Sequence, residues 1–138
     1  MAGAAVTPRV RTIVICDEVT SSPVEHGVFN LDGVQNHLLA ESFPLRVRLN
    51  LYLVLSSHRR GRFSGTVLVV NQRDDRVLRN LEFNARFDQD NALVPMYLEL
   101  GQCPFPEAGA FRFEINFNTG DREVLKGEHP FHVLSIEE

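Results

Sequence analysis

The sequence predicts an all-β protein, an antiparallel β-sandwich of about eight to ten short strands. Three observations lead to this prediction. Apolar and polar residues alternate strictly in several segments, most clearly over residues 111–118. Turn-forming residues separate these segments at intervals typical of short strands. No segment shows the apolar periodicity of an amphipathic helix of three turns.

Residues 111–118 read Phe-Arg-Phe-Glu-Ile-Asn-Phe-Asn. Because the side chains of a strand point alternately to its two faces, this segment has one apolar and one polar face. The apolar face consists of Phe111, Phe113, Ile115 and Phe117, and the polar face of Arg112, Glu114 and Asn116. We expect one face to be buried and the other to meet water, as is common in antiparallel sheets.

The first part of the chain predicts a tail followed by short strands. We expect residues 1–9 to form a disordered tail and residues 10–138 to form a single domain. A continuously apolar strand at 12–16, buried on both faces or nearly so, precedes a loop at 17–27 and a strand at 28–31. We expect a short strand at 34–39, with one helical turn as the alternative.

The longest alternating segment covers residues 45–55 and carries leucine or valine at every second position. Its other face begins polar, with Arg46, Arg48 and Asn50, and becomes apolar at Tyr52 and Val54. We therefore expect another element or a partner to cover that apolar half. Residues 57–61 are predicted to be a hairpin loop, which makes 63–70 the strand that pairs with 45–55.

The second part of the chain predicts strands at 81–87 and 93–100, a proline-rich crossing at 101–109, and then the strand at 111–118. Two short strands, at 123–126 and 131–136, end the chain. Pro95 lies inside the strand at 93–100. Because proline has no N–H to donate, this strand is expected at a sheet edge or at a bulge.

Composition narrows the possible functions. The chain has 138 residues, of which 43% are hydrophobic and 23% charged, as expected for one globular domain with its own core. Ten phenylalanines and no tryptophan indicate a core built on Phe, Leu and Val. The formal net charge of −4 favours solubility and argues against a nucleic-acid partner, which usually needs a basic surface.

The cysteines and the N-terminus indicate a cytoplasmic protein. Two cysteines, Cys16 and Cys103, are too few for a disulfide framework, although folding could bring them close enough to pair. Arg9 and Arg11 interrupt the weakly apolar N-terminus, so we expect no signal peptide. No stretch approaches the roughly 18 apolar residues of a membrane span. We expect no membrane association and no cofactor.

A basic cluster is the best candidate for an interaction surface. It consists of His58, Arg59, Arg60 and Arg62 at the predicted hairpin, and we expect Arg46 and Arg48 on the preceding strand to extend it. Such a cluster could attract a phosphate or an acidic protein surface. The alternative is a solvated turn whose charges prevent edge-to-edge aggregation.

Three other groups of residues could carry chemistry, but none has the required pattern. His129 and His132 lie beside Glu128, yet spacing of three along a strand turns the two rings to opposite faces. Cys16 precedes Asp17 without a histidine base placed by any motif. The aspartates 74, 75, 88 and 90 match no calcium-loop spacing. We predict no catalytic and no metal-binding residues.

An ordered set of short motifs spans nearly the whole chain. They are Ile-Val-Ile-Cys-Asp at 13–17, Asn-Leu-Asp-Gly-Val at 30–34, Phe-Pro at 43–44, Phe-Pro-x-x-Gly-x-Phe-x-Phe at 105–113 and Pro-Phe-His-Val at 130–133. In this order the chain resembles a family of small, mostly bacterial proteins of unknown function. The resemblance implies an immunoglobulin-like β-sandwich and brings neither catalytic residues nor a cofactor.

The sequence therefore favours a non-enzymatic module that binds a protein partner through loop tips or a sheet edge. A self-assembling structural protein that uses the apolar face at Tyr52 and Val54 is the alternative. A metal-dependent enzyme has the least support.

Overall fold

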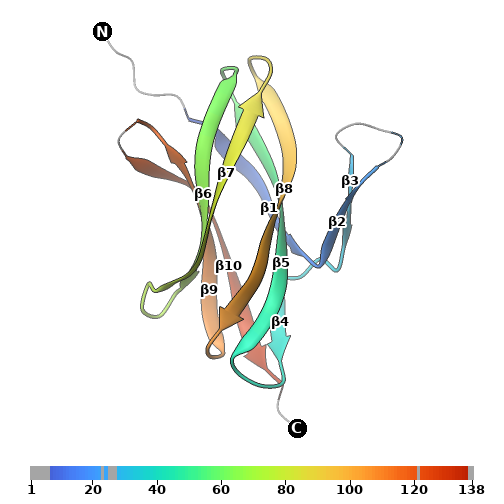
Figure 1. Cartoon of the computed structure of the whole chain (residues 1–138), viewed down its shortest axis with the longest axis vertical. Helices are drawn as coiled ribbons and strands as arrows, with labels where there is room; N and C mark the ends of the chain where they lie inside the picture. The colour runs from blue at the N-terminus through green and yellow to red at the C-terminus, as the bar shows by residue number, and fades with distance from the viewer. Residues whose placement is uncertain (1–6, 23, 25–27, 121, 137–138) are drawn as a thin grey trace.

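The computed structural model describes residues 7–22, 24, 28–120 and 122–136, and within them the chain forms ten β-strands and no helix (Figure 1). The strands are β1 (Arg9–Cys16), β2 (Glu18–Ser21), β3 (Phe29–Asp32), β4 (His37–Ala40), β5 (Leu45–Ser57), β6 (Gly61–Asn71), β7 (Val77–Phe87), β8 (Ala92–Phe105), β9 (Gly109–Asn118) and β10 (Glu123–Ser135). The all-β prediction is confirmed. The predicted tail falls mostly on residues 1–6, which lie outside the described residues, and β1 already begins at Arg9.

The strands belong to three sheets. One sheet has the order β1-β5-β8, a second has the order β4-β10-β9-β6-β7, and β2 pairs with β3 alone. The named strands pair antiparallel except for β4 and β10, which run parallel. In Figure 1 the β2–β3 hairpin projects from one side of the two larger sheets.

The inner faces of the two larger sheets share one hydrophobic core. The aromatic side chains that are buried to less than 2% exposure are Phe87, Phe105, Phe111, Phe113, Phe117 and Phe131. Four of these rings, those of Phe105, Phe111, Phe113 and Phe131, contact one another, and the centroids of Phe113 and Phe131 are 4.7 Å apart. Burial of such large apolar side chains is the main stabilising contribution, as the phenylalanine-rich composition predicted.

The chain crosses between sheets where the sequence predicted a hairpin. Strand β5 pairs with β1 and β8, whereas β6 pairs with β7 and β9. The prediction that 63–70 pairs with 45–55 is therefore wrong, and residues 58–60 connect the two sheets. A short polar turn can join two strands of the same sheet or two strands of different sheets. Which of these forms depends on contacts between segments that are far apart in the sequence.

At several positions where the sequence predicted a loop or the end of a strand, the structure has a β-bulge or a further strand. Strand β8 continues through Gly101 and the predicted crossing to Phe105, and β10 joins the two short strands predicted at 123–126 and 131–136. The register of each shifts beside a glycine, Gly101 in β8 and Gly127 in β10. Strand β2 was predicted as loop. The short strand expected at 34–39 is present as β4, which begins at His37 and ends at Ala40, and Pro95 lies in an edge strand as expected.

The outer face of the three-stranded sheet is partly covered. Thr12 is exposed and Val14 is half-buried, so the expectation that 12–16 is buried on both faces is wrong. The ring of Phe29, in β3, lies 5.8 Å from that of Tyr52 and 5.9 Å from that of Tyr97. The apolar part of β5 is therefore covered by another element at Tyr52, one of the two outcomes that the sequence predicted.

Candidate functional site

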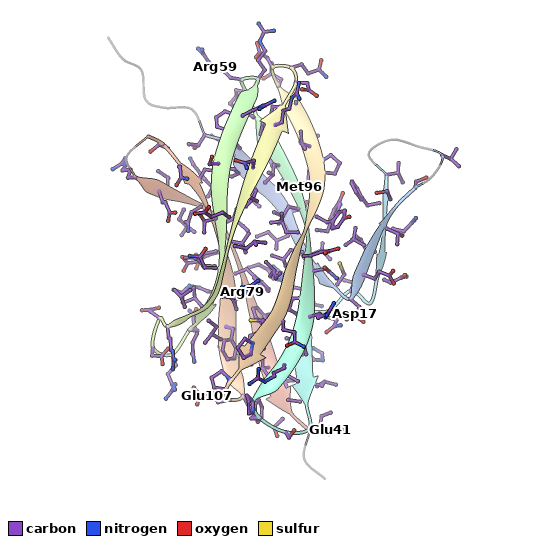
Figure 2. All side chains as sticks on the ribbon, viewed as in Figure 1. Asp17, Glu41, Arg59, Arg79, Met96 and Glu107 are labelled. Atoms are coloured by element: carbon purple, nitrogen blue, oxygen red, sulfur yellow. The ribbon has the colours of Figure 1, made fainter. Side chains whose placement is uncertain are left out.

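Two connections between the sheets form one end of the molecule, where Figure 2 labels Arg59. The backbone N–H of Asn91 donates to the carbonyl of His58 at 3.1 Å, and that of Arg60 donates to Oδ1 of Asp90 at 2.9 Å. The hydroxyl of Ser57 donates to the carbonyl of Arg59 at 2.6 Å. These bonds fix the turn at 58–60 against the turn at 88–91, so the side chains of the exposed turn project from a defined backbone.

The structure separates the predicted basic cluster into two groups. His58, Arg59, Arg60 and Arg62 are exposed and lie together at or beside the turn. Arg46 and Arg48 are also exposed, but they lie near the start of β5, paired with Pro104 and Gln102. A strand rises about 3.3 Å per residue, so twelve residues separate Arg46 from His58 by about 40 Å. Arg46 and Arg48 therefore do not extend the patch.

A β-bulge brings two other arginines to this end. In an unbroken strand, Arg9 and Arg11 would share a face with Ile13 and Ile15, which pack in the core. The register of β1 against β5 shifts between Val10 and Thr12, which leaves Arg11 as an extra residue. The bulge turns both arginines outward while the isoleucines stay inside. We call Arg9, Arg11, His58, Arg59, Arg60 and Arg62 the arginine end.

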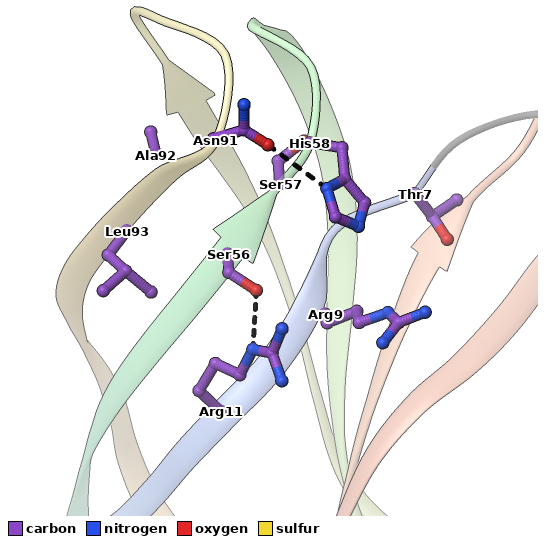
Figure 3. Close-up of a pocket in the computed structure, with 9 residues that line it drawn as sticks. All are labelled: Thr7, Arg9, Arg11, Ser56, Ser57, His58, Asn91, Ala92 and Leu93. Carbon is purple, nitrogen blue, oxygen red and sulfur yellow. Dashed lines mark hydrogen bonds between the residues drawn. The ribbon is translucent and has the colours of Figure 1, made fainter.

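A surface pocket lies beside the arginine end (Figure 3). Its volume is about 230 Å³, and its lining includes Arg9, Arg11, Ser56, His58 and Asn91. Arg11 donates a hydrogen bond from Nε to Oγ of Ser56 at 2.8 Å. Nδ1 of His58 lies 3.3 Å from Oδ1 of Asn91. No aspartate or glutamate is among the described residues that line the pocket.

The two acids of the neighbouring turn at 88–91, Asp88 and Asp90, have partners other than the guanidinium groups of the arginine end. Asp90 accepts the backbone N–H of Arg60, and Asp88 forms an ion pair with Arg86 at 2.7 Å. Arg62 stands directly opposite Arg86 on the neighbouring strand. In the part of the chain that the structure describes, the guanidinium groups of Arg9, Arg11, Arg59 and Arg60 form no ion pair. Their guanidinium groups are therefore open to a ligand or partner, although the carboxylate of Asp90 lies beside the backbone of Arg60.

The weaker candidate sites do not assemble. Asp74 and Asp75 lie at one end of β7 and Asp88 and Asp90 at the other, so they cannot hold one ion. Among the described residues, no three His, Cys, Asp or Glu side chains are placed to hold a metal. Glu128 lies 3.5 Å from Nε of Arg112, and burial lowers the pKa of His129. His132 is exposed.

The two cysteines are free and buried. Burial raises the pKa of the Cys16 thiol, and the charge of Asp17 raises it further. Burial raises the pKa of Cys103 to about 11. A thiol that stays protonated is a poor nucleophile, so neither cysteine has the environment of a reactive residue.

The fold and this end of the molecule define an all-β domain with an exposed cationic end. Residues 11–134 match the model of a family of unknown function, DUF6941, and the chain belongs to this family. A search of the curated proteins found no match. In the described part of the chain, no helix is long and apolar enough to cross a membrane.

Arg9 and Arg11 are the site residues that sequence reasoning missed. One signal was available: Arg9 and Arg11 alternate in phase with Ile13 and Ile15, although arginine and isoleucine rarely share a face. Such a conflict of phase indicates a bulge between the two pairs.

Proposed function

We propose that the protein is a non-enzymatic interaction module whose arginine end docks an acidic surface of a partner protein. The observation that carries the proposal is the concentration of exposed arginines at one fixed end of a chain whose formal net charge is −4. Opposite charges on two surfaces steer encounter and fix the orientation of binding. Arginine also suits protein interfaces because its planar guanidinium pairs with carboxylates through two hydrogen bonds.

The turn at 58–60 supports this role because its backbone is held on both sides. The hydroxyl of Ser57 donates a hydrogen bond to the carbonyl of Arg59 within the turn. Asp90 and Asn91, in the turn at 88–91, form hydrogen bonds with its backbone from the other side. A partner that binds Arg59 and Arg60 therefore meets a pre-organised backbone and orders mainly the side chains. The two buried, unpaired cysteines fit a reducing compartment, and we propose a cytoplasmic location.

We further propose that the two larger sheets form an immunoglobulin-like β-sandwich. The order β1-β5-β8 opposite β4-β10-β9-β6-β7 supports this, as do the repeated crossings between the sheets after β5, β7 and β8. A sandwich of this kind carries its connecting loops at its two ends. The arginine end is one of these loop clusters.

The test is an affinity capture from cells of the native host with the full chain as bait. The variant Arg59→Glu with Arg60→Glu reverses charge at the arginine end, and Arg46→Glu with Arg48→Glu makes the same change at the far end of β5. We expect a specific partner that the first variant loses, that the second retains, and that dissociates as salt is raised. Equal retention by both variants would exclude the arginine end as the docking surface.

Self-association is the second candidate. On the outer face of the three-stranded sheet, Leu93 is 67% exposed and Tyr97 is 39% exposed, although Phe29 contacts the ring of Tyr97. If this face pairs two copies, light scattering over a concentration series will show a dimer that Leu93→Arg dissociates. A chain that stays monomeric at high concentration excludes this candidate.

A further inference from the structure

The pocket between β1 and the turn at 58–60 has the composition of an anion site. Arg9, Arg11 and His58 line it with two guanidinium groups and an imidazole, and Ser56 adds a hydroxyl (Figure 3). Since the hydroxyl of Ser56 accepts from Arg11, its own hydrogen is free to donate to a ligand. The described lining offers no carboxylate that would compete for these donors.

We infer that this pocket binds a phosphate group, held by Arg9, Arg11, Ser56 and His58. The inference rests on the proposed docking role of the arginine end and names the chemical group that enters the pocket. A phosphate monoester carries a charge of about −1.5 to −2 and three acceptor oxygens. The charges of two arginines match this charge. Their two planar guanidinium groups can donate hydrogen bonds to different oxygens of the tetrahedral phosphate. A carboxylate is planar, carries one charge and is satisfied by a single arginine.

The arrangement of Arg11 supports this inference. Its Nε is occupied by Ser56, which orients the guanidinium and leaves both Nη groups available. Arg9 stands opposite Ser56 in the pairing of β1 with β5, and both arginines line the pocket. The bulge that turns Arg9 and Arg11 outward interrupts the regular hydrogen bonding between β1 and β5. Bulges that redirect side chains are common beside functional sites.

The phosphate could belong to a phosphorylated residue of the partner or to a small phosphorylated molecule. Inorganic phosphate and a phosphoserine peptide, each titrated against the full chain, distinguish the two sources. Tighter binding of the peptide indicates a phosphorylated protein, and equal or weaker binding indicates a small molecule. The unphosphorylated peptide and acetate are the controls for the peptide chain and for a carboxylate.

The test is a titration followed by amide chemical shifts, which needs no knowledge of the partner. We expect saturable shifts at Arg9, Arg11 and Ser56. The double variant Arg9→Gln with Arg11→Gln should weaken phosphate binding at least tenfold, and Arg46→Gln with Arg48→Gln, which removes the same charge, should change it by less than twofold. Folding of both variants is checked by the shifts of β9.

Three results would overturn the inference: no saturable binding of either phosphate probe, equal weakening by the two double variants, or acetate binding as tight as phosphate. These results are independent of the affinity capture. A pocket that binds phosphate in a chain without a protein partner would contradict only the proposed docking role. A partner captured by a chain that binds no phosphate would contradict only the pocket.

Discussion

Arg112 donates a hydrogen bond from Nε to Oε2 of Glu114 at 2.6 Å, and both side chains are largely buried although they lie on the face of β9 that was predicted to meet water. Their side chains are only 15% and 18% exposed. The turn between β6 and β7 covers them, because Arg112 also donates to Gln72 at 2.8 Å and to Asp75 at 3.0 Å. The hydrogen bond with Glu114 raises the pKa of Arg112.

Replacing Arg112 with alanine should lower the free energy of unfolding by about 2 kcal/mol, because it leaves the largely buried carboxylate of Glu114 without its main partner. The matched control is Arg86→Ala, which breaks the ion pair with Asp88, whose side chains are 66% and 77% exposed. We expect that control to cost about 0.5 kcal/mol or less. Equilibrium unfolding in urea measures both, and equal losses would show that burial of the Arg112 pair adds nothing.

The alternating faces of β5, β7 and β9 could be predicted from the sequence because period two is a local property. Their buried positions follow the pattern closely: Phe111, Phe113, Ile115 and Phe117 are 0–1% exposed. The cover over the polar face of β9 could not be predicted. It depends on a turn some 40 residues earlier in the chain. Asn116 on the same face is only 7% exposed and lies between Thr66 and Leu125 of the neighbouring strands.

The candidate site was predictable only where its residues are adjacent in sequence. Arg59 and Arg60 lie in one turn, so the sequence identified them together. The pairing of β1 with β5 places Arg9 and Arg11 at the same end of the molecule as this turn. Arg46 lies far from it because β5 is 13 residues long. Strand β2 was missed because Glu18–Ser21 has a single apolar residue, Val19, and pairs only with β3.

Phe29 should hold the β2–β3 hairpin against the three-stranded sheet through its contacts with Tyr52 and Tyr97. Ring pairs of this kind contribute about 0.5–1.5 kcal/mol each. Phe29→Ala should therefore raise amide hydrogen exchange in β2 and β3 at least fivefold and leave exchange in β9 unchanged. The control, Asn30→Ala, changes an exposed neighbour. If exchange in β9 rises equally, the hairpin is part of the cooperative core.

Gly65 in β6 should not tolerate a side chain. A Cβ there would lie 2.5 Å from Cζ of Phe83 and 2.9 Å from the carbonyl oxygen of Asn116. The Phe83 ring passes over Gly65 to meet that of Phe117, with centroids 5.6 Å apart. Replacing a strand glycine with alanine gains up to about 1 kcal/mol where space permits, but crowding a packed core costs about 1–3 kcal/mol.

We therefore expect Gly65→Ala to lower the free energy of unfolding by about 2 kcal/mol. Ser64→Ala, on the exposed face of the same strand, should change it by less than about 0.5 kcal/mol. Equilibrium unfolding in urea measures the free energy of unfolding of both variants. A Gly65→Ala protein as stable as the parent would show that the Phe83 ring moves aside freely.

Cys103 should make the protein less stable at alkaline pH. Its side chain is fully buried, and burial raises the pKa of the thiol from 9.0 to about 11. Below pH 9 the thiol is protonated in both the folded and the unfolded chain, so Cys103 adds no pH dependence there. Between pH 9 and 11 only the unfolded chain releases the proton, and the free energy of unfolding should fall by up to about 1.4 kcal/mol per pH unit from this group.

The variant Cys103→Ala isolates this effect because alanine does not titrate. It should be less stable than the parent at pH 7, since it leaves a small cavity, but its stability should decline less steeply from pH 9 to 11. Cys16→Ala is the matched control, which removes the other buried thiol and leaves the contribution of Cys103 in place. Urea midpoints measured at half-unit steps give the slopes. Parallel slopes for the parent and Cys103→Ala would mean that Cys103 reaches solvent and ionises in the folded chain.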